Sequence, residues 1–281
     1  MFGGGGFMGR ALAAHLRALG DHVDTPPRAD VSMSDAGAIA AVVAAARPEI
    51  IVNLAGISSV THEDAAALYE TNMLGHLRVL QAAAPGTRVF LASTANVYGQ
   101  GDGARGFAES DEPAPRNHYA LSKLSAERLH VLFADKLTLA AARPFNCIGR
   151  GQKTTLVISK LVDGFRRRLP EIELGTLEVA RDFVDIRDVC VMWERLIAAP
   201  TPPAAVNFGN GEAVSLAEII AVLERLSGHR PQIRSSQALV RASDLTYQRA
   251  DTRVLTALGY QRRHSLEETL AWMLAEESGS S

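Results

Sequence analysis

The feature that most limits the possible folds is a repeated alternation of short apolar runs with longer helical patterns. Three runs, Glu49 to Leu54, Arg88 to Ala92 and Leu137 to Ala142, are rich in apolar residues. Such runs are typical of strands that are buried on both faces of a parallel sheet. The segments between them include Asp35 to Ala45 and about Ala65 to Ala84, which have helical patterns. This alternation predicts an α/β fold with a doubly wound parallel sheet.

The chain opens with a cluster of glycines ahead of a helical pattern. Gly3, Gly6 and Gly9 have the spacing GxxGxxG. This spacing lets backbone N–H groups approach a pyrophosphate at the N-terminus of a helix, although consecutive glycines also suit a flexible loop. The motif should follow a buried strand, but only Met1 and Phe2 precede it. We therefore expect a first strand that is very short, or one that begins upstream of this sequence.

A second strand is predicted at His22 to Thr25, where Pro26 and Pro27 end it. Dinucleotide-binding folds usually carry an acidic residue at the end of this strand, and that residue binds the ribose 2′-hydroxyl. No such residue is evident, and Arg28 stands nearby instead. An arginine here favours a 2′-phosphate, and hence NADP over NAD, although an ordinary loop arginine fits the same pattern.

One predicted helix combines a phenol and an ammonium group. Tyr119 and Lys123 are four residues apart, in a segment where Leu121, Leu124 and Leu129 have helical spacing. Residues at this separation lie on the same face of a helix, one turn apart. A fixed ammonium group stabilises the ionised phenol and lowers its pKa toward the range that is useful for proton transfer. The pair is a candidate acid/base site, although a solvated pair on the helix surface has the same spacing.

Composition argues against several classes of function. The chain has 281 residues, 47% of them hydrophobic, and a formal net charge of -2. No basic excess indicates nucleic acid or an anionic membrane as a partner. No apolar run near a terminus is typical of a transmembrane span or a signal peptide. Cys147 and Cys190 lack the spacing of a metal site or a disulfide framework, so we expect no metal and a cytoplasmic protein.

The alternation becomes looser after Asn146. We expect a short strand at Arg181 to Ile186, and helices at Leu156 to Arg168, Asp188 to Ala198, Leu216 to Leu226 and Leu266 to Leu274. These elements predict a smaller lobe over the carboxyl edge of the sheet. We place the nucleotide-binding domain at 1–208 and the smaller substrate lobe at 209–281, with part of 148–180 joining that lobe.

Six motifs follow one another along the chain. They are the glycine motif at 3–9, Asn53-Leu54-Ala55-Gly56, Ser93-Thr94-x-x-Val97-Tyr98-Gly99, Tyr119-x-x-x-Lys123, Arg143-Pro144-Phe145-Asn146 and Arg181-Asp182-Phe183-Val184-Asp185-Ile186-Arg187-Asp188. Over nearly the whole chain this set resembles the extended short-chain dehydrogenase/reductase family, within it the NAD(P)-dependent epimerase/dehydratase group acting on sugar nucleotides. The resemblance implies a Rossmann fold. The segment Gly175 to Phe183 looks most like the branch that contains GDP-mannose 4,6-dehydratase and GDP-4-keto-6-deoxymannose reductase.

The resemblance also implies roles for individual residues. Tyr119 would be the acid/base, Lys123 would lower its pKa and bind the nicotinamide ribose, and Thr94 would bind the substrate oxygen. Substrate contacts are implied for Asn146, and for Arg181 and Arg241 on the nucleotide diphosphate, although Arg181 could instead pair with Asp182 or Asp185. A homodimer, formed by the helices around Asn72 and Tyr119, is implied as well. The residues expected to bind NAD or NADP are Gly3, Gly6, Phe7, Met8, Arg28, Asp30, Val31, Leu54, Ala55, Gly56, Tyr119 and Lys123.

The two residues that follow Thr94 discriminate between reactions. Dehydratases of the family carry carboxylates there, because elimination of water needs an acid and a base besides the tyrosine. Here the residues are Ala95 and Asn96, neither of which can carry a proton. We therefore expect reduction of a 4-keto-6-deoxy sugar nucleotide, with C4 epimerisation as the second candidate. Two functions of another kind also fit these residues: a non-catalytic cofactor-binding scaffold or regulator, and a reductase of a substrate that is not a nucleotide.

Overall fold

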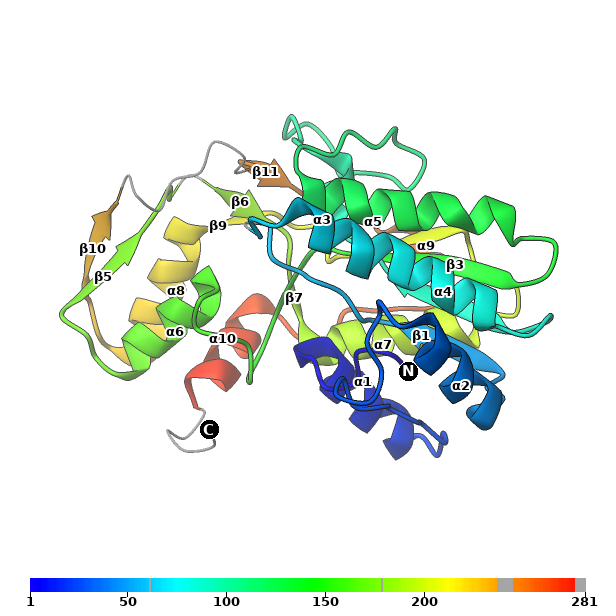
Figure 1. The fold of residues 1–281 in the computed structure, drawn as a ribbon. Coiled ribbons are helices and arrows are strands. Elements are labelled where there is room, and N and C mark those ends of the chain that lie inside the picture. Colours follow the sequence, from blue (N-terminus) through cyan, green and yellow to red (C-terminus); the bar gives the residue numbers. More distant parts are fainter. Residues whose placement is uncertain (61, 178, 237–244, 276–281) are drawn as a thin grey trace.

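A computed structural model describes residues 1–60, 62–177, 179–236 and 245–275. Its central feature is a parallel sheet with the strand order β1-β2-β3-β8 (Figure 1). The predicted doubly wound α/β fold is confirmed, and the boundaries predicted for the strand at Arg88–Ala92 are those observed. The strands of this sheet are β1 (Ile50–Asn53), β2 (Arg88–Ala92), β3 (Thr138–Pro144) and β8 (Ala205–Phe208).

The first strand is reduced to a single bridge. Phe2 pairs in parallel with Asn53, donating its N–H to Val52 O and accepting from Leu54 N–H, both at 3.0 Å. The predicted strand at His22 to Thr25 is wrong, because these residues have no regular structure. A strand needs a neighbouring strand to pair with, and the neighbouring segment here is Met1 and Phe2. The Met1 amino group donates to Asp24 O at 2.7 Å, which is too little for a ladder.

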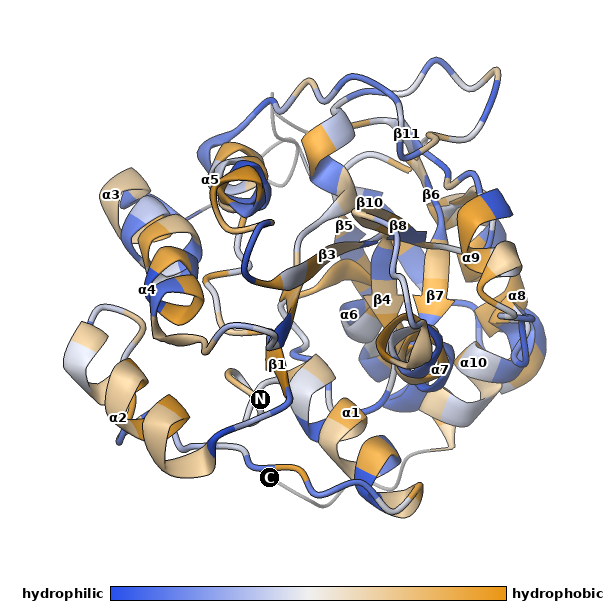
Figure 2. Cartoon of the chain, turned by 90° about the vertical axis from the view of Figure 1, so that its right-hand side faces the viewer, coloured by the Kyte–Doolittle hydropathy of each residue, from blue (hydrophilic) through white to orange (hydrophobic). Residues whose placement is uncertain are grey.

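The two faces of the sheet bury different helices, because successive side chains of a strand point to opposite sides. Ile51 and Val89 belong to one apolar cluster, and Val52 and Phe90 belong to another. Figure 2 shows the two groups of helices on either side of the strands. They are α2 (Ala36–Ala46), α4 (Gly75–Ala82) and α5 (His118–Arg128) on one side, and α1 (Phe7–Ala18) and α7 (Ile186–Ala198) on the other.

The helix predicted at Ala65 to Ala84 is interrupted. It consists of α3 (Ala65–Leu68), a π-helical segment (Tyr69–Leu74) and α4. Such π segments are frequently found at functional sites. Here the segment carries Asn72, which is 1% exposed and reaches across to α5.

Polar segments follow the carboxyl ends of the strands. Ser93 and Thr94 come directly after β2 and lead into a 3-10 turn at Ala95–Tyr98. Helix α5 begins where the side chain of Asn117 accepts the N–H of Ala120, at 2.8 Å. This cap fixes the start of the helix one residue before Tyr119. A second 3-10 turn, Leu129–Leu132, continues α5.

A further apolar cluster, distinct from the two that cover the sheet, forms the smaller lobe. Its helices pack together over a parallel pair of strands, at the left of Figure 1. The boundaries predicted for Leu266–Leu274 are those observed. The elements of this lobe are α6 (Val157–Arg166), β5 (Glu171–Leu174), α8 (Leu216–Ser227), β10 (Gln232–Ser235) and α10 (Leu266–Leu274).

The strand predicted at Arg181 to Ile186 is two strands with different partners. Asp182 lies between them and is fully buried, and its carboxylate accepts the backbone N–H groups of Asn210, Gly211 and Ala250 at 2.9 to 3.2 Å. This inward turn separates the two ladders. The remaining short elements are β4 (Asn146–Ile148), β6 (Ala180–Arg181), β7 (Phe183–Asp185), β9 (Val214–Ser215), β11 (Tyr247–Gln248) and α9 (Arg253–Ala257).

Within the described part of the chain, no helix combines the length and the apolar character that crossing a membrane requires.

Candidate active site

Three predicted catalytic residues meet where β2 ends. Tyr119 lies in the first turn of α5 and Lys123 one turn later, while Thr94 follows β2. All three are buried, with 8%, 4% and 7% of their surfaces exposed. The side chain of Thr94 lies close enough to the phenol of Tyr119 to influence its pKa. The structure therefore brings two hydroxyl groups and an ammonium group to the carboxyl edge of a parallel sheet, where ligands bind in such folds.

The expectation that Lys123 lowers the pKa of Tyr119 is wrong for this state of the protein. Burial raises the pKa of the Tyr119 phenol, and the polar side chain of Thr94 opposes this shift. Lys123 Nζ instead donates to Ala92 O, at 2.8 Å. Burial lowers the pKa of Lys123 itself to about 8, and the charge of Glu127 opposes this shift. The lysine is thus held at the end of β2, one helical turn from Tyr119.

An ionic network that no sequence pattern predicted lies behind Lys123. Glu127, four residues after Lys123, accepts a hydrogen bond from Ser93 Oγ and lies 2.7 Å from Arg143 Nη2. Arg143 also donates to the phenol oxygen of Tyr98, at 2.8 Å, and its guanidinium lies over the same ring. Both charged side chains are buried, with 8% of Glu127 and 7% of Arg143 exposed. The four-residue spacing to Lys123 was the only sequence signal for this network.

The glycine motif forms a loop with little space for side chains. Gly3 has φ +78°, and a Cβ atom there would lie 2.6 Å from Ala55 N. A Cβ on Gly9 would lie 2.1 Å from Gly3 O, whereas one on Gly5 would meet nothing within 4 Å. Gly6 caps α1, which puts the free N–H groups of that helix at the loop. This cradle fits a pyrophosphate, because its main chain can approach the ligand closely.

A second close approach lies at the end of β1. A Cβ on Gly56 would lie 2.7 Å from Asn72 Oδ1 and 2.9 Å from Lys123 Nζ. Asn72 binds both main-chain groups of Ile57 and donates to Ser122 Oγ at 3.0 Å. The amide of Asn72 therefore ties the Leu54 to Ile57 segment to the catalytic helix. Asn72 follows two other polar residues, Glu70 and Thr71, so the sequence gave no sign of this role.

The other residues expected to bind the cofactor have varied surroundings. Phe7 and Met8 lie in the first turn of α1, and Met8 Sδ accepts the indole N–H of Trp193 at 3.3 Å. Arg28 is exposed beyond the glycine loop, as is Asp30. Val31 is 6% exposed and belongs to an apolar core cluster, so its side chain is structural.

The predicted substrate residues lie on the side of the smaller lobe. Asn146 begins β4 and donates to Asp182 O at 3.4 Å, while Arg181 in β6 is partly buried and donates to Ala180 O at 3.2 Å. Asp185, one of the two carboxylates considered as a partner of Arg181, forms its ion pair with Arg187, at 2.6 Å. Arg241 lies outside the described residues.

Ala95 and Asn96, the positions at which dehydratases of the family carry carboxylates, begin the 3-10 turn that follows Thr94. Ala95 is buried, and the N–H of Asn96 donates to Thr94 Oγ1 at 3.2 Å. Burial raises the pKa of the Cys147 thiol well above the ordinary value, so this thiol keeps its proton. His118, which precedes Tyr119, contacts the Tyr69 hydroxyl at 3.1 Å, outside the buried site.

Comparisons with known proteins identify the family of this chain. A family model described as the NAD dependent epimerase/dehydratase family matches residues 1–209. The GDP-6-deoxy-D-talose 4-dehydrogenase of Aggregatibacter actinomycetemcomitans is 28% identical, over 93% of this chain and 91% of the relative. The GDP-6-deoxy-D-mannose reductase of Pseudomonas aeruginosa is 29% identical, over 96% of this chain and 94% of the relative.

A solved structure shares the fold over almost its whole length. RMD from Pseudomonas aeruginosa, complexed with NADPH, is 27% identical, with a TM-score of 0.86 over 98% of this chain and 97% of that chain. The matched region of the family model contains the glycine loop, the three catalytic candidates and the network behind them. The protein belongs to the NAD-dependent epimerase/dehydratase family.

Proposed function

We propose that this protein reduces the C4 keto group of a 4-keto-6-deoxy sugar nucleotide, with NADPH as the preferred reductant. The observation that carries the proposal is the buried group of Thr94, Tyr119 and Lys123, beside two positions that lack carboxylates. The similarity to a GDP-6-deoxy sugar dehydrogenase and to a GDP-6-deoxy-D-mannose reductase supports the same class of substrate.

The residues of the site divide the chemistry between them. The nicotinamide, when bound, supplies the hydride. Tyr119 donates its phenolic proton to the carbonyl oxygen, and Thr94 holds that oxygen by a second hydrogen bond. Lys123 Nζ, which Ala92 O holds one helical turn from Tyr119, would bind the nicotinamide ribose. Asn146, Arg181 and Arg241 bind the nucleotide part of the substrate, the arginines through bidentate contacts with the diphosphate.

C4 epimerisation uses the same three residues and is the second candidate. The relatives include a dTDP-L-rhamnose 4-epimerase, which is 28% identical over 87% of this chain. The two reactions differ in how the cofactor is used. An epimerase keeps its cofactor between half-reactions and consumes none, whereas a reductase consumes one NAD(P)H for each sugar.

The test is to incubate the protein with a 4-keto-6-deoxy sugar nucleotide and either NADPH or NADH. The absorbance of the reduced nicotinamide and the C4 configuration of the product are then followed. One equivalent of cofactor oxidised per sugar reduced supports the proposal. Interconversion of C4 epimers without oxidation would assign the epimerase, and bound cofactor with no turnover of any sugar nucleotide would assign a scaffold. A parallel titration with GDP, UDP, dTDP and CDP, read as thermal stabilisation, identifies the base.

We further propose a cytoplasmic homodimer and a division of the chain into a cofactor domain at 1–208 and a substrate lobe at 209–281, with part of 148–180 joining that lobe. Three large apolar side chains are exposed on α5 and the turn that follows it: Leu121, Val131 and Leu132, at 42%, 77% and 70%. Pairing with a second copy would cover them. Light scattering should give twice the chain mass of 30.1 kDa, and Val131→Glu should lower it toward one chain. A single-chain mass for the unaltered protein would refute the dimer.

A further inference from the structure

A groove unrelated to the catalytic trio lies between α1, α7 and α10. Its volume is about 460 Å³, which is within the range of small-molecule pockets. Helices α1 and α7 cover the face of the sheet opposite to α5, as Figure 2 shows, so Tyr119 does not border this groove. The floor is apolar, and the side chains that form it are Phe7, Ala11, Ile186, Cys190 and Trp272.

Three arginines line the same groove, and two of them have no carboxylate partner among the described residues. Arg10 donates from Nη1 to Gly5 O, at 2.6 Å, and Arg150 donates from Nε to Trp272 O, at 2.7 Å. A Cβ on Gly151 would lie 3.8 Å from Arg10 Nη2, so the loop that carries Arg150 runs beside Arg10. Each guanidinium keeps unused donors, and an oxyanion between them would satisfy both.

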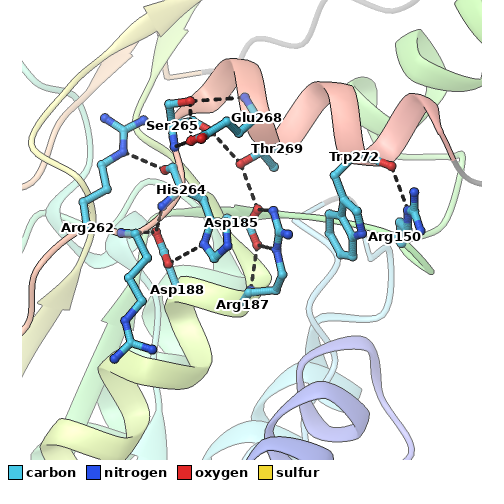
Figure 3. A network of polar contacts seen from close by, with 11 residues as sticks. Arg150, Asp185, Arg187, Asp188, Arg262, His264, Ser265, Glu268, Thr269 and Trp272 are labelled. Atoms are coloured by element: carbon cyan, nitrogen blue, oxygen red, sulfur yellow. Dashed lines mark hydrogen bonds and ion pairs between the residues drawn. The ribbon is translucent and has the colours of Figure 1, made fainter.

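The groove is already ordered around Trp272. The guanidinium of Arg150 lies 4.9 Å, and that of Arg187 4.1 Å, from the centroid of the indole ring. Figure 3 shows Arg187 held by Asp185 and Asp185 held by Thr269 of α10. Because these contacts fix the side chains before a ligand arrives, little conformational entropy is lost on binding.

We propose that this groove binds a small organic oxyanion, a phosphate or a carboxylate carried on an apolar ring system. The anion contacts Arg10 and Arg150, and the ring packs on the apolar floor. A purely apolar ligand would leave the two cations without a counter-charge, and a bare anion would leave the floor in contact with water. The groove lies away from the catalytic trio but adjoins the proposed cofactor site, since Phe7 borders both and Arg10 donates to Gly5 O of the glycine loop.

The two tryptophans give a measurement that is specific for the site. Trp272 lines the groove, whereas Trp193 is fully buried and contacts Met8 beside the glycine loop. The protein, saturated with NADP⁺, is titrated with 1-naphthyl phosphate while the two indole N–H resonances are followed by NMR. We expect a saturable shift of the Trp272 resonance with that of Trp193 unchanged. Titration with 1-naphthoate then shows which oxyanion binds more tightly.

Variants and simpler probes complete the test. Arg10→Met and Arg150→Met should each weaken binding about tenfold, the usual effect of losing one charge-assisted hydrogen bond. Arg17→Met is the matched control, because Arg17 is on the same helix but donates to Val23 O. Inorganic phosphate and 1-naphthol should both bind more weakly than the naphthyl phosphate. Equal binding of 1-naphthol, an unshifted Trp272 resonance, or unchanged affinity in both variants would overturn the proposal.

Discussion

The glycine loop and the catalytic helix build their halves of the site by opposite means. The loop is made of main chain, and its geometry requires that side chains be absent, since a Cβ on Gly9 would lie 2.1 Å from Gly3 O. The region behind α5 is made of side chains, where Lys123, Glu127 and Arg143 are buried and interact. We therefore expect the loop to lose cofactor affinity when a methyl group is added. We expect the network to lose stability when a charged group is removed.

The difference also separates binding from chemistry. A loop of backbone N–H groups can hold any pyrophosphate, so it specifies a class of cofactor and no reaction. The hydroxyl and ammonium groups of α5 and β2 decide whether a proton moves. Changes at α5 should therefore reduce turnover while the cofactor still binds, and changes in the loop should weaken cofactor binding first.

The largest effect is expected for Tyr119→Phe. Without the phenolic proton, turnover should fall by roughly 10²–10⁴, while folding and NADPH affinity stay near those of the unaltered protein. Initial rates and a cofactor titration by fluorescence measure both. Tyr69→Phe is the control, because its hydroxyl contacts His118 outside the buried site, and its rate should change less than about twofold. Comparable rates for the two variants would show that Tyr119 does not donate the proton.

Removal of the charge behind Lys123 should have the largest effect on stability. Glu127→Gln leaves Arg143 buried without its counter-charge, which usually costs about 3–5 kcal/mol of unfolding free energy. Glu267→Gln breaks an ion pair of Arg225 on the surface, where Glu267 is 49% exposed, and should cost far less, because solvent screens the two charges. Urea unfolding of the two variants compares the pairs directly. Similar losses would mean that the buried pair contributes no more than a surface one.

Local signals in the sequence predicted much of the fold. The strand at 88–92 and the helix at 266–274 have the predicted boundaries, because both depend on short-range apolar patterns and, for the helix, on the cap at Ser265. The glycine loop was predicted for a related reason, since a loop that has no room for side chains is marked in the sequence by its glycines. Where a pattern depended on a distant partner, prediction failed. His22 to Thr25 forms no strand because its neighbour is a single bridge.

The network around Arg143 shows the same limit inside the site. Glu127 and Arg143 are 16 residues apart and lie on a helix and a strand, so no periodicity links them. The helical spacing of Tyr119 and Lys123 was right, but their electrostatic relation was not. Spacing alone cannot show that burial raises the pKa of Tyr119, or that Lys123 Nζ is bound to Ala92 O.

The buried ammonium of Lys123 should leave a signature in the pH dependence of stability. Burial lowers its pKa to about 8, below the ordinary 10.5, so between these pH values the unfolded chain binds more protons than the folded one. Stability relative to Lys123→Met should therefore rise as the pH increases through this window, by up to about 3 kcal/mol. Unfolding by urea at a series of pH values, without cofactor, measures the difference. Parallel curves for the two proteins would mean that Lys123 has an ordinary pKa.

The loop offers a matched pair of substitutions. Gly9→Ala forces its Cβ into Gly3 O and Gly4 Cα, and overpacking of this kind typically costs about 1–3 kcal/mol. Because the strain falls on the loop, NADPH affinity should drop by roughly tenfold to a hundredfold. Gly5→Ala adds the same methyl group where nothing lies within 4 Å, and should leave affinity unchanged. Equal affinities for both variants would show that the tight packing of the loop is irrelevant to cofactor binding.

The smallest effect is expected for Arg28, a side chain proposed to assist the cofactor site that the main chain of the glycine loop forms. Arg28 is exposed just beyond the loop, and as the proposed partner of a 2′-phosphate it should raise the preference for NADPH over NADH. An exposed contact between charges is weak, so Arg28→Ala should lower the ratio of kcat/KM values for the two cofactors by no more than about fivefold. The change should come from KM for NADPH, because NADH has no phosphate to lose contact with. It should also shrink as salt is added, since exposed charges are screened. Arg167→Ala, at the end of α6, is an exposed control whose ratio should not move. A ratio that stays constant in Arg28→Ala at low salt would mean that this arginine is an ordinary loop residue, and that the cofactor site at this end consists of main chain alone.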